Sequence, residues 1–396
     1  MRLVHSATFI NGQKVFNVMD HGAKGDGVAD DTNAFMETWK ATCAAAGDSS
    51  TMVVPSGHTF LLLPIVFEGN CKSNKLNLQI LGQIVAPELS RWNAKDMSKW
   101  LEFHGIKGLS VTGPGALDGR GQSWWNLKCN INPKPGCFRE APAMIKLIGC
   151  TDLQLSNLTF TNSPQMHVAI DDGLRINATY LHITSPATSP NTDGIHVEHS
   201  QHVEIGYSVI GTGDDCISIG DKTSDLDIHH IECGPGHGIS VGSLGGKGEQ
   251  VSVENIHVSY VNFKASSNGA RIKTWQGGEG FVTSVWFENI NFTNVMNPVI
   301  IDQYYCDLSQ ARSCIAQPKA VQISNITYDH LYGTSQTATA VTLNCSQTVS
   351  CNAIELSFVN ITSAVPGVKT DAACINAHGY SRGYVIPDVP CLRRLG

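Results

Sequence analysis

The sequence predicts an all-β fold, a single right-handed parallel β-helix with a short N-terminal capping helix. Two observations support this prediction: a short apolar pattern recurs along the chain, and Asn or Gly marks the bends within and between its copies. The pattern is Φ-x-Φ-x-x-Φ-x-Φ, where Φ is an apolar residue. Clear copies begin at Leu153, Leu226, Val251, Val285, Val321 and Ile354, and looser copies begin at Leu174 and Val203.

Each copy is interpreted as two alternating strands around a two-residue bend. Alternation with period two points one face of each strand inward, and no copy can bury that face alone. Stacking the copies as coils of a solenoid buries a continuous core. A β-sandwich is the rival fold, but it predicts hairpin turns about every 8 to 12 residues. Few convincing two-residue hairpins occur in this sequence.

The two ends of the solenoid should be capped. Asp30, Asp31 and Thr32 are N-cap candidates for a helix near residues 31–46, which would cover the first coil. Residues 373–396 are expected to cap the other end. No linker is visible, so residues 16–396 are expected to form one catalytic β-helix domain. Residues 1–15 are expected to be an extension without a clear signal peptide.

Composition limits the classes of partner. The net charge of −7 argues against nucleic acid, and an acidic substrate would need a few local cations for its binding. No apolar run approaches the length of a membrane span, so no membrane partner is expected. We expect a monomer that needs no cofactor and no metal.

Cysteines and glycosylation sequons point to an oxidising, extracellular compartment. The 13 cysteines include several pairs at short separation and no C-x2-C spacing, which favours disulfides over zinc sites. Asn-x-Ser/Thr sequons predict glycosylation. They lie at Asn157, Asn177, Asn291, Asn325, Asn344 and Asn360.

Four polar clusters recur with the period of the coils. Asp215 follows Asp193 by 22 residues, and His237 follows Asp215 by 22 residues. Arg271 and Lys273 come after a longer coil and alternate onto one side of their strand. Stacking should bring these groups into one groove, with coils about 4.8 Å apart.

Each cluster has an ordinary structural interpretation. Asp and Gly are common turn residues, a Gly-His-Gly segment is usually a turn, and alternating cations are usually solvated. The shared register favours a functional site instead, because stacked like charges lower the stability of a sheet.

These clusters resemble the signature motifs of polygalacturonases, a family of inverting glycoside hydrolases with β-helix folds. The motifs occur in family order, and the likeness runs from about Phe16 to the C-terminal cysteines. They read Asn191-Thr192-Asp193, Gly213-Asp214-Asp215-Cys216, Gly236-His237-Gly238 and Arg271-Ile272-Lys273. The longer strings SPNTDGIHV, IGTGDDCISIG, CGPGHGIS and NGARIKTW resemble the plant branch.

The resemblance implies a role for each residue in cleavage of pectin, that is, of polygalacturonate. Asp214 would be the general acid, and Asp193 and Asp215 would hold and activate the water. His237 would tune the protonation of the acid. The substrate-binding residues implied are Asn191, Arg271, Lys273 and Tyr305. Tyr305 matches less securely because Tyr304 adjoins it.

The chemistry agrees with these residue types. Glycoside hydrolysis needs one protonated and one ionised carboxyl group, and adjacent carboxylates push each other's pKa values apart. Inverting enzymes usually keep their two carboxyl groups roughly 6.5–9.5 Å apart. Coil stacking suggests a shorter distance between Asp193 and Asp215, but both residues can serve one water if Asp214 is the acid.

Proximity along the chain and the family pattern together imply six disulfides and one buried free thiol at Cys150. The implied pairs are Cys43–Cys71, Cys129–Cys137, Cys216–Cys233, Cys306–Cys314, Cys345–Cys351 and Cys374–Cys391. The strings WLEFHGIKGL and NSPQMHV resemble the endo-acting plant enzymes, so endo action is expected and exo action is the alternative.

Other functions remain as alternatives. A pectate lyase would bind Ca²⁺ through Asp193, Asp214 and Asp215, and chelation should abolish its activity. A wall-associated carbohydrate-binding protein or allergen would keep the groove without turnover. A zinc enzyme could use His196, His199 and His202, but this spacing alternates faces on a strand, so we expect surface and turn histidines.

Overall fold

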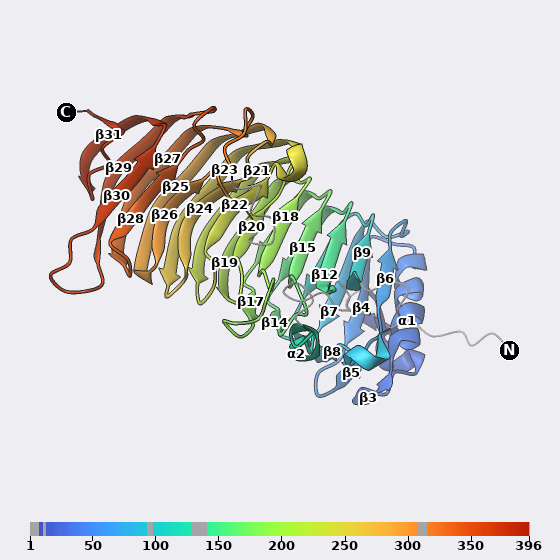
Figure 1. Cartoon of the computed structure of the whole chain (residues 1–396). Coiled ribbons are helices and arrows are strands. Elements are labelled where there is room, and N and C mark those ends of the chain that lie inside the picture. Colours follow the sequence, from blue (N-terminus) through green and yellow to red (C-terminus); the bar gives the residue numbers. More distant parts are fainter. Residues whose placement is uncertain (1–7, 11–12, 93–97, 128–140, 307–314, 396) are drawn as a thin grey trace. The chain divides into compact units, whose positions relative to one another are not determined.

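The computed structural model describes residues 8–10, 13–92, 98–127, 141–306 and 315–395. The chain divides into two compact units, Met1–Ile195 and His196–Gly396, and each is described by itself. Within both units, strands of successive coils pair in parallel (Figure 1). The fold class predicted from the sequence, a parallel β-helix with few helices, is confirmed. In the described residues, no helix is long and apolar enough to cross a membrane.

The first unit contains three parallel ladders and a short antiparallel strand. The first ladder is β2 (Gln13–Asn17), β4 (Ser49–Val54), β7 (Lys75–Ile80), β10 (Leu109–Thr112), β13 (Thr151–Ser156) and β16 (Leu174–Thr179). The second is β3 (Asp26–Asp30), β5 (Thr59–Leu61), β8 (Gln83–Val85), β11 (Ala116–Asp118), β14 (Thr159–Thr161) and β17 (His182–Thr184). The third is β6 (Ile65–Glu68), β9 (Lys99–His104), β12 (Ala143–Ile148) and β15 (Val168–Asp171). Strand β1 (Thr8–Ile10) pairs antiparallel with β2.

Helix α1 (Thr32–Ala44) covers the first coil, as predicted, with slightly narrower bounds (Figure 1). The Trp39 ring packs edge-on against Phe67, with ring centroids 5.2 Å apart, and its Nε1 donates to the Glu68 carbonyl. The predicted capping differs in detail. Asp31 is the N-cap residue but makes no side-chain cap bond, because its carboxylate accepts the Lys24 and Gly25 amides instead. The other helical segments of this unit are α2 (Gln122–Trp125), η1 (Val18–His21) and η2 (Leu89–Arg91).

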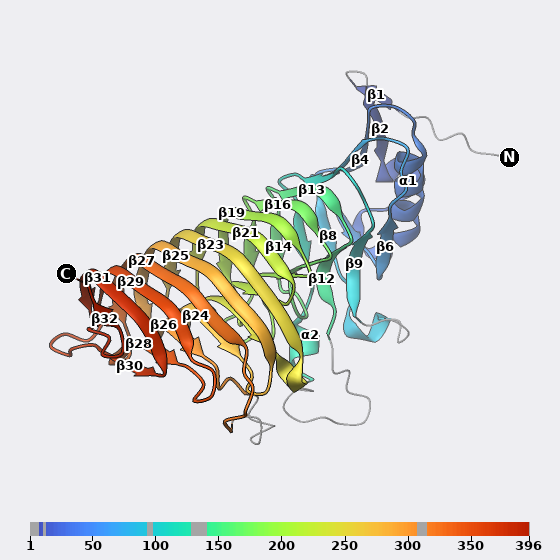
Figure 2. The ribbon, with the colours of Figure 1, turned by 90° about the horizontal axis from the view of Figure 1, so that it is seen from above.

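The second unit contains long strands on one side and short strands on the other (Figure 2). The long ladder is β19 (Gln201–Gly211), β21 (Thr223–Cys233), β23 (Gln250–Lys264), β25 (Glu279–Val295), β27 (Gln322–Ser335), β29 (Cys351–Ser363), β31 (Ala377–Ile386) and β32 (Arg393–Arg394). The short ladder is β20 (Ile217–Ile219), β22 (Ile239–Leu244), β24 (Asn268–Thr274), β26 (Asn297–Asp302), β28 (Thr339–Asn344) and β30 (Asp371–Ile375). Strand β18 (Ile195–Glu198) lies at the start of this unit, and η3 (Gly246–Gly248) follows β22.

In the core of the second unit, the register places apolar and aromatic side chains of successive coils on top of one another. Val258 pairs with Phe287, and Phe287 pairs with Tyr328, whose ring stacks on it with centroids 5.4 Å apart. All three side chains are fully buried. Such columns bury apolar surface between neighbouring coils, which is the main stabilising contribution expected of a solenoid.

Left-handed bends interrupt the long strands, at Asn255, Asn289 and Asn325 as the sequence pattern predicted and at aromatic residues elsewhere. Tyr207, His230 and Tyr260 all have left-handed backbone, with φ of 52°, 54° and 53°. Their rings stack in sequence, with centroids 4.7 Å and 5.0 Å apart. Left-handed backbone disfavours ordinary residues by roughly 1–2 kcal/mol. Aromatic pairs contribute about 0.5–1.5 kcal/mol each, which offsets part of that cost.

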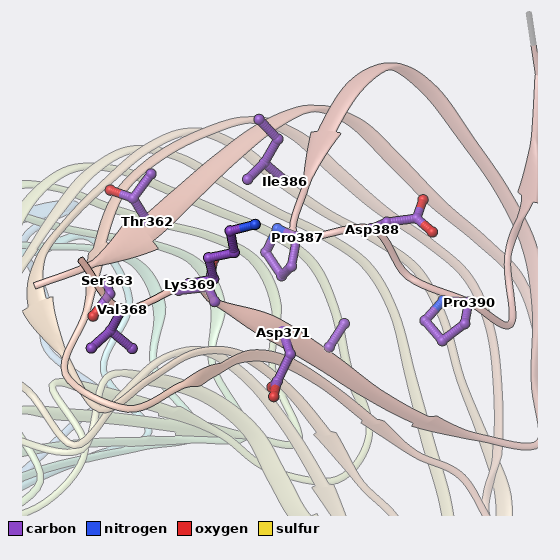
Figure 3. Close-up of a pocket in the computed structure, with 11 residues that line it drawn as sticks. Thr362, Ser363, Val368, Lys369, Asp371, Ile386, Pro387, Asp388 and Pro390 are labelled. Atoms are coloured by element: carbon purple, nitrogen blue, oxygen red, sulfur yellow. The ribbon is translucent and has the colours of Figure 1, made fainter. Parts of the chain in front are cut away.

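The C-terminal segment extends the solenoid and does not simply cap it. Strand β30 pairs with β28 and β31 pairs with β29, so residues 371–386 form a further coil. This corrects the expectation that residues 373–396 only cover the end. The error has a plain cause, since this segment lacks a clear copy of the apolar pattern. A surface hollow lies between the segments 362–372 and 386–390, lined by Lys369, Asp371 and Asp388 together with apolar side chains (Figure 3).

Disulfides occur at four of the six expected pairs within the described residues. They are Cys43–Cys71, Cys216–Cys233, Cys345–Cys351 and Cys374–Cys391. Cys306 is also disulfide-bonded, but its expected partner Cys314 and both members of Cys129–Cys137 lie outside the described residues. Cys150 is a buried free thiol, as expected, and burial raises its pKa.

Candidate active site

Strands β22, β24 and β26 place Arg271 and Lys273 on one face. Ile239, Ala270 and Val299 are in register and fully buried, so they form the inner side. Alternation therefore turns the neighbouring residues outward: Ser240 is in register with Arg271, and Lys273 with Asp302. The structure thus brings Arg271 and Lys273 to the same side, as the sequence predicted.

Asp215 is held by two cations and a serine. Its Oδ1 accepts from Arg271 Nη2 at 2.5 Å and from Ser240 Oγ at 2.9 Å, and its Oδ2 accepts from Lys273 Nζ at 2.8 Å. The Asp215 side chain is 1% exposed and that of Lys273 is 9% exposed. Three donors therefore hold this buried carboxyl group in one fixed orientation.

Asp214 lies beside Asp215 but has a different environment. Its Oδ1 accepts from the Asp215 amide at 2.8 Å and lies 3.0 Å from His237 Nδ1. Among the described residues, no hydrogen bond to its Oδ2 is present, and the side chain is 19% exposed. One carboxyl oxygen is therefore fixed by the protein, while the other can carry a proton toward a bound molecule.

Electrostatics couple Asp214 to His237. Burial has the largest single influence on the pKa of Asp214 and acts to raise it. The hydrogen bond from His237 and the charges of His237 and Lys273 outweigh burial and lower the pKa below 3.8. The same hydrogen bond raises the pKa of His237 above 6.5, and the charge of Asp215 adds to that rise. Both shifts favour an ionised Asp214 beside a protonated His237.

The turn that carries His237 requires its two glycines. Gly238 has φ of 86°, and a Cβ there would lie 2.4 Å from the carbonyl oxygens of Asn268 and Gly269. A Cβ at Gly236 would lie 2.8 Å from the Asp214 carbonyl oxygen. That carbonyl accepts the His237 amide at 2.8 Å, so close backbone approach fixes the imidazole beside Asp214.

In the first unit, the motif Asn191-Thr192-Asp193 forms a turn just before β18. Asn191 is exposed with a left-handed φ of 54°, whereas Asp193 is 8% exposed. Thr192 Oγ1 lies 2.7 Å from Ser189 Oγ, and the Asp193 carbonyl accepts the His167 amide at 2.8 Å. The turn is therefore held from inside the unit.

The structure distinguishes Tyr305 from its neighbour Tyr304. The Tyr305 ring lies 5.4 Å from Lys273 Nζ and packs edge-on against Trp275. The Tyr304 side chain has a different partner: its hydroxyl oxygen accepts the Gln347 amide at 2.9 Å. Tyr305, the less secure of the sequence predictions, is the tyrosine beside the cation.

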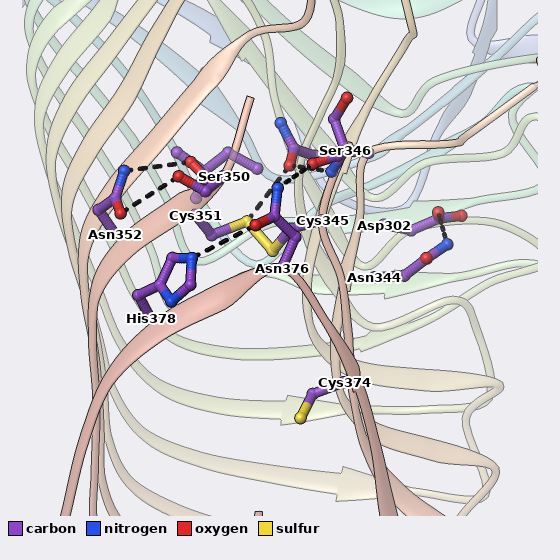
Figure 4. The surroundings of a disulfide bond; sticks show 12 residues. Asp302, Asn344, Cys345, Ser346, Ser350, Cys351, Asn352, Cys374, Asn376 and His378 are labelled. Atoms are coloured by element: carbon purple, nitrogen blue, oxygen red, sulfur yellow. Dashed lines mark hydrogen bonds between the residues drawn. A yellow bond between two sulfur atoms is a disulfide. The ribbon is translucent and has the colours of Figure 1, made fainter. Parts of the chain in front are cut away.

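A polar extension of this face runs along β26 and β28. Asn344 Nδ2 donates to Asp302 Oδ1 at 3.0 Å, beside the Cys345–Cys351 disulfide (Figure 4). Asn344 was predicted as a glycosylation site, but its amide nitrogen is hydrogen-bonded on the face that carries Lys273. Asn157, Asn291 and Asn325 are exposed, and glycosylation of the six sequons stays a prediction.

Sequence reasoning assigned no role to Ser240 or His167, although the strings CGPGHGIS and NSPQMHV contain them. Ser240 Oγ donates to Asp215 and accepts from Arg271 Nε at 2.8 Å, so it joins the two charged groups. The available signal was register, since Ser240 stands directly beside Arg271 on the next strand. His167 precedes Asp193 by 26 residues, about one coil, and this spacing was the signal for it.

The donors at Asp215 do not suit a cation site. Asp214, Asp215 and His237 cluster closely enough to offer three ligand atoms. However, a guanidinium and an ammonium already contact the Asp215 oxygens, and their charge would repel Ca²⁺.

Among the three histidines of the zinc alternative, His196 bonds Ser218 at 2.8 Å and His202 lies 3.7 Å from Asp225. His196 and His202 therefore have separate partners.

The sequence profile of the glycosyl hydrolases family 28 matches residues 43–384. The chain belongs to this family. Curated relatives of this family 28 chain include a protein of Malus domestica called polygalacturonase, 43% identical over 94% of this chain and 79% of the relative. Another, polygalacturonase-2 of Solanum lycopersicum, is 38% identical over 95% of this chain and 81% of the relative.

Solved structures agree on the fold of this family 28 chain. The endo-xylogalacturonan hydrolase of Aspergillus tubingensis superposes with a TM-score of 0.79, at 23% identity, over 92% of this chain and 96% of that one. The polygalacturonase of Erwinia carotovora superposes with a TM-score of 0.73, at 24% identity, over 88% and 93%. At these identities the likeness supports the β-helix fold alone.

Proposed function

We propose that this family 28 chain is a polygalacturonase that hydrolyses α-1,4-galacturonosidic bonds of pectin with inversion of configuration. The observation that carries the proposal is the contrast between adjacent carboxyl groups. Asp215 is buried and both of its oxygens contact the cations of Arg271 and Lys273, while Asp214 is paired with His237 and keeps one oxygen without a partner among the described residues. Relatives called polygalacturonase, at about 40% identity, support the same substrate class.

In this proposal Asp214 is the general acid. It must carry a proton when the glycosidic oxygen leaves, although its pKa is lowered in the free protein. A galacturonate carboxylate brings negative charge into the site, which raises the pKa of a neighbouring carboxyl group. Asp214 can then take up a proton at Oδ2, while Oδ1 keeps its 3.0 Å contact with His237 Nδ1 and the imidazolium releases a proton to solvent.

Asp193 and Asp215 are proposed to orient and deprotonate the attacking water. Asn191, Arg271, Lys273 and Tyr305 are proposed to bind the substrate. The ammonium of Lys273 has three donors and uses one on Asp215, so it can also contact a substrate carboxylate. Tyr305 lies beside this ammonium and offers a ring face for a sugar.

The test is digestion of polygalacturonate by the purified chain, with and without chelator. We expect new reducing ends, unchanged rates in chelator and no ultraviolet absorbance from unsaturated products. Proton NMR of the first product should show the inverted anomer. Loss of activity in chelator together with unsaturated products would mean a calcium-dependent lyase, and no turnover at all would mean a binding protein.

We further propose endo action, secretion to the cell wall and a monomeric state. The disulfides support an oxidising compartment. Product lengths after brief digestion test the mode of action. Mixed long oligomers are expected for endo cleavage, whereas monomer as the first product would mean exo cleavage.

A further inference from the structure

His167 is a fully buried histidine in the first unit, and the proposed chemistry does not yet use it. It directly precedes β15 and is 0% exposed. Two of its atoms contact the same oxygen: the main-chain nitrogen lies 2.8 Å, and Nδ1 lies 3.0 Å, from the carbonyl oxygen of Asp193. One residue thus holds the backbone of a motif aspartate from two directions.

The partners of the ring define one tautomer. A carbonyl oxygen only accepts, so Nδ1 must carry the hydrogen that faces Asp193. The Ser163 amide donates toward Nε2 at 3.4 Å, so Nε2 must be an acceptor. Ser185 Oγ, at 2.9 Å, then donates to Nε2 as well. Every polar atom of the imidazole has a partner in its neutral form.

Charge on this ring is disfavoured. Burial lowers the pKa of His167 to about 4, although nearby carbonyl groups, that of Asp193 first among them, oppose the shift. The ring is therefore neutral above that pH and keeps the tautomer that donates to Asp193. Proton exchange with substrate is excluded for a side chain that is fully buried.

The contacts around the turn extend the same restraint. The Val168 amide donates to the Gly194 carbonyl at 3.1 Å, so the residues on either side of the His167–Asp193 contact are fixed too. Ser189 and Thr192 close the turn from the other end. The direction of the Asp193 carboxylate depends on this backbone.

We infer that His167 is a positioning residue, which fixes the Asp193 backbone through its neutral imidazole and so sets the direction of the Asp193 carboxylate. This rests on the proposed function, in which Asp193 helps to activate water. Displacing a reacting group by about 1 Å can cost on the order of 100-fold in rate. Loss of the Nδ1 donor should therefore lower kcat and leave KM nearly unchanged.

Three substitutions separate positioning from simple core packing. In His167→Asn the side-chain amide can donate from near the Nδ1 position, in His167→Gln it reaches only the Nε2 side, and His167→Leu fills the volume without a donor. We expect His167→Asn to retain most of kcat, and the other two to lose roughly 10- to 100-fold. If His167→Leu does not fold, the comparison of Asn with Gln still decides.

The decisive experiment is a double-mutant cycle with Asp193→Asn on polygalacturonate, with circular dichroism as the folding control. Because His167 acts through Asp193, adding His167→Gln to Asp193→Asn should change the residual kcat by less than about twofold. Multiplicative losses, or equal kcat for His167→Asn and His167→Gln, would overturn the inference. Absence of hydrolysis by the unmodified chain would instead refute the proposed function.

Discussion

His237 Nδ1 lies 3.0 Å from Asp214 Oδ1, and the same aspartate accepts the His237 amide at its main-chain carbonyl. The imidazole is therefore fixed to the proposed acid by both its backbone and its ring. The side chain is 42% exposed, so solvent reaches it. A histidine that contacts both the proposed acid and solvent can restore the proton that Asp214 gives up in each turnover.

The pH profile should report this pair. The hydrogen bond with Asp214 raises the pKa of His237, so the imidazolium persists above pH 6.5 and is lost as the pH rises through the raised value. We expect the activity of the unmodified chain to fall along an alkaline limb that lies above pH 6.5. His237→Gln should lower kcat by about 10- to 100-fold and abolish that limb. An alkaline limb that is unchanged in His237→Gln would assign it to another group.

Ser240 should matter because it joins Asp215 to Arg271. Ser240→Ala removes one donor from Asp215 Oδ1 and the acceptor of Arg271 Nε. We expect a stability loss of about 1 kcal/mol, from denaturant unfolding, and a clear fall in kcat. Ser335→Ala is the matched control, since Ser335 is also fully buried and donates to the Thr337 carbonyl. The control should lose similar stability and keep its kcat; an equal fall in kcat for both variants would contradict a specific role for Ser240.

The Cys216–Cys233 disulfide should support both stability and activity. Cys216 follows the acid pair and donates its amide to Gly238, while Cys233 ends β21, four residues before His237. Replacing both cysteines by Ala opens a loop with a sequence separation of 17, which should cost roughly 3 kcal/mol in the chain-entropy model. We expect a lower melting temperature and a lower kcat.

The Cys43–Cys71 disulfide provides the control for that experiment. Its loop has a sequence separation of 28, and within the first unit it joins the end of α1 to the segment between β6 and β7. Its double alanine variant should lose comparable stability and retain kcat at temperatures where it is folded. Retention of full kcat by the Cys216/Cys233 variant would show that the bridge serves stability alone.

The sequence predicted the β-helix and the candidate site for a physical reason. Period-two alternation determines which side chains face inward, and spacings near one coil place polar residues such as Asp215 and His237 in the turns before the neighbouring strands β20 and β22. The contact between His237 and Asp214 follows from that register. Local sequence patterns therefore suffice to predict the fold and the neighbouring polar residues where each coil repeats the preceding one.

What the sequence did not predict depends on contacts across coils. The resemblance implied that Arg271 and Lys273 bind substrate, and the structure shows that both contact Asp215. Both roles require the two cations on the same face, so the sequence pattern could not distinguish them. Ser240 and His167 lie in the family-like strings CGPGHGIS and NSPQMHV, but a single serine or histidine is common in any core and its type alone indicates no role. Their importance lies in the partners that register gives them.

The central claim is that Asp214 is the general acid, and Asp214→Asn tests it most directly. The asparagine is nearly isosteric and can still bond to the Asp215 amide, so the fold and substrate binding should persist. We predict that kcat on polygalacturonate falls by about 10²–10⁴-fold, while a substrate with a better leaving group that needs little protonation loses far less. A variant that is folded by circular dichroism and turns over polygalacturonate at the unmodified rate would contradict the account.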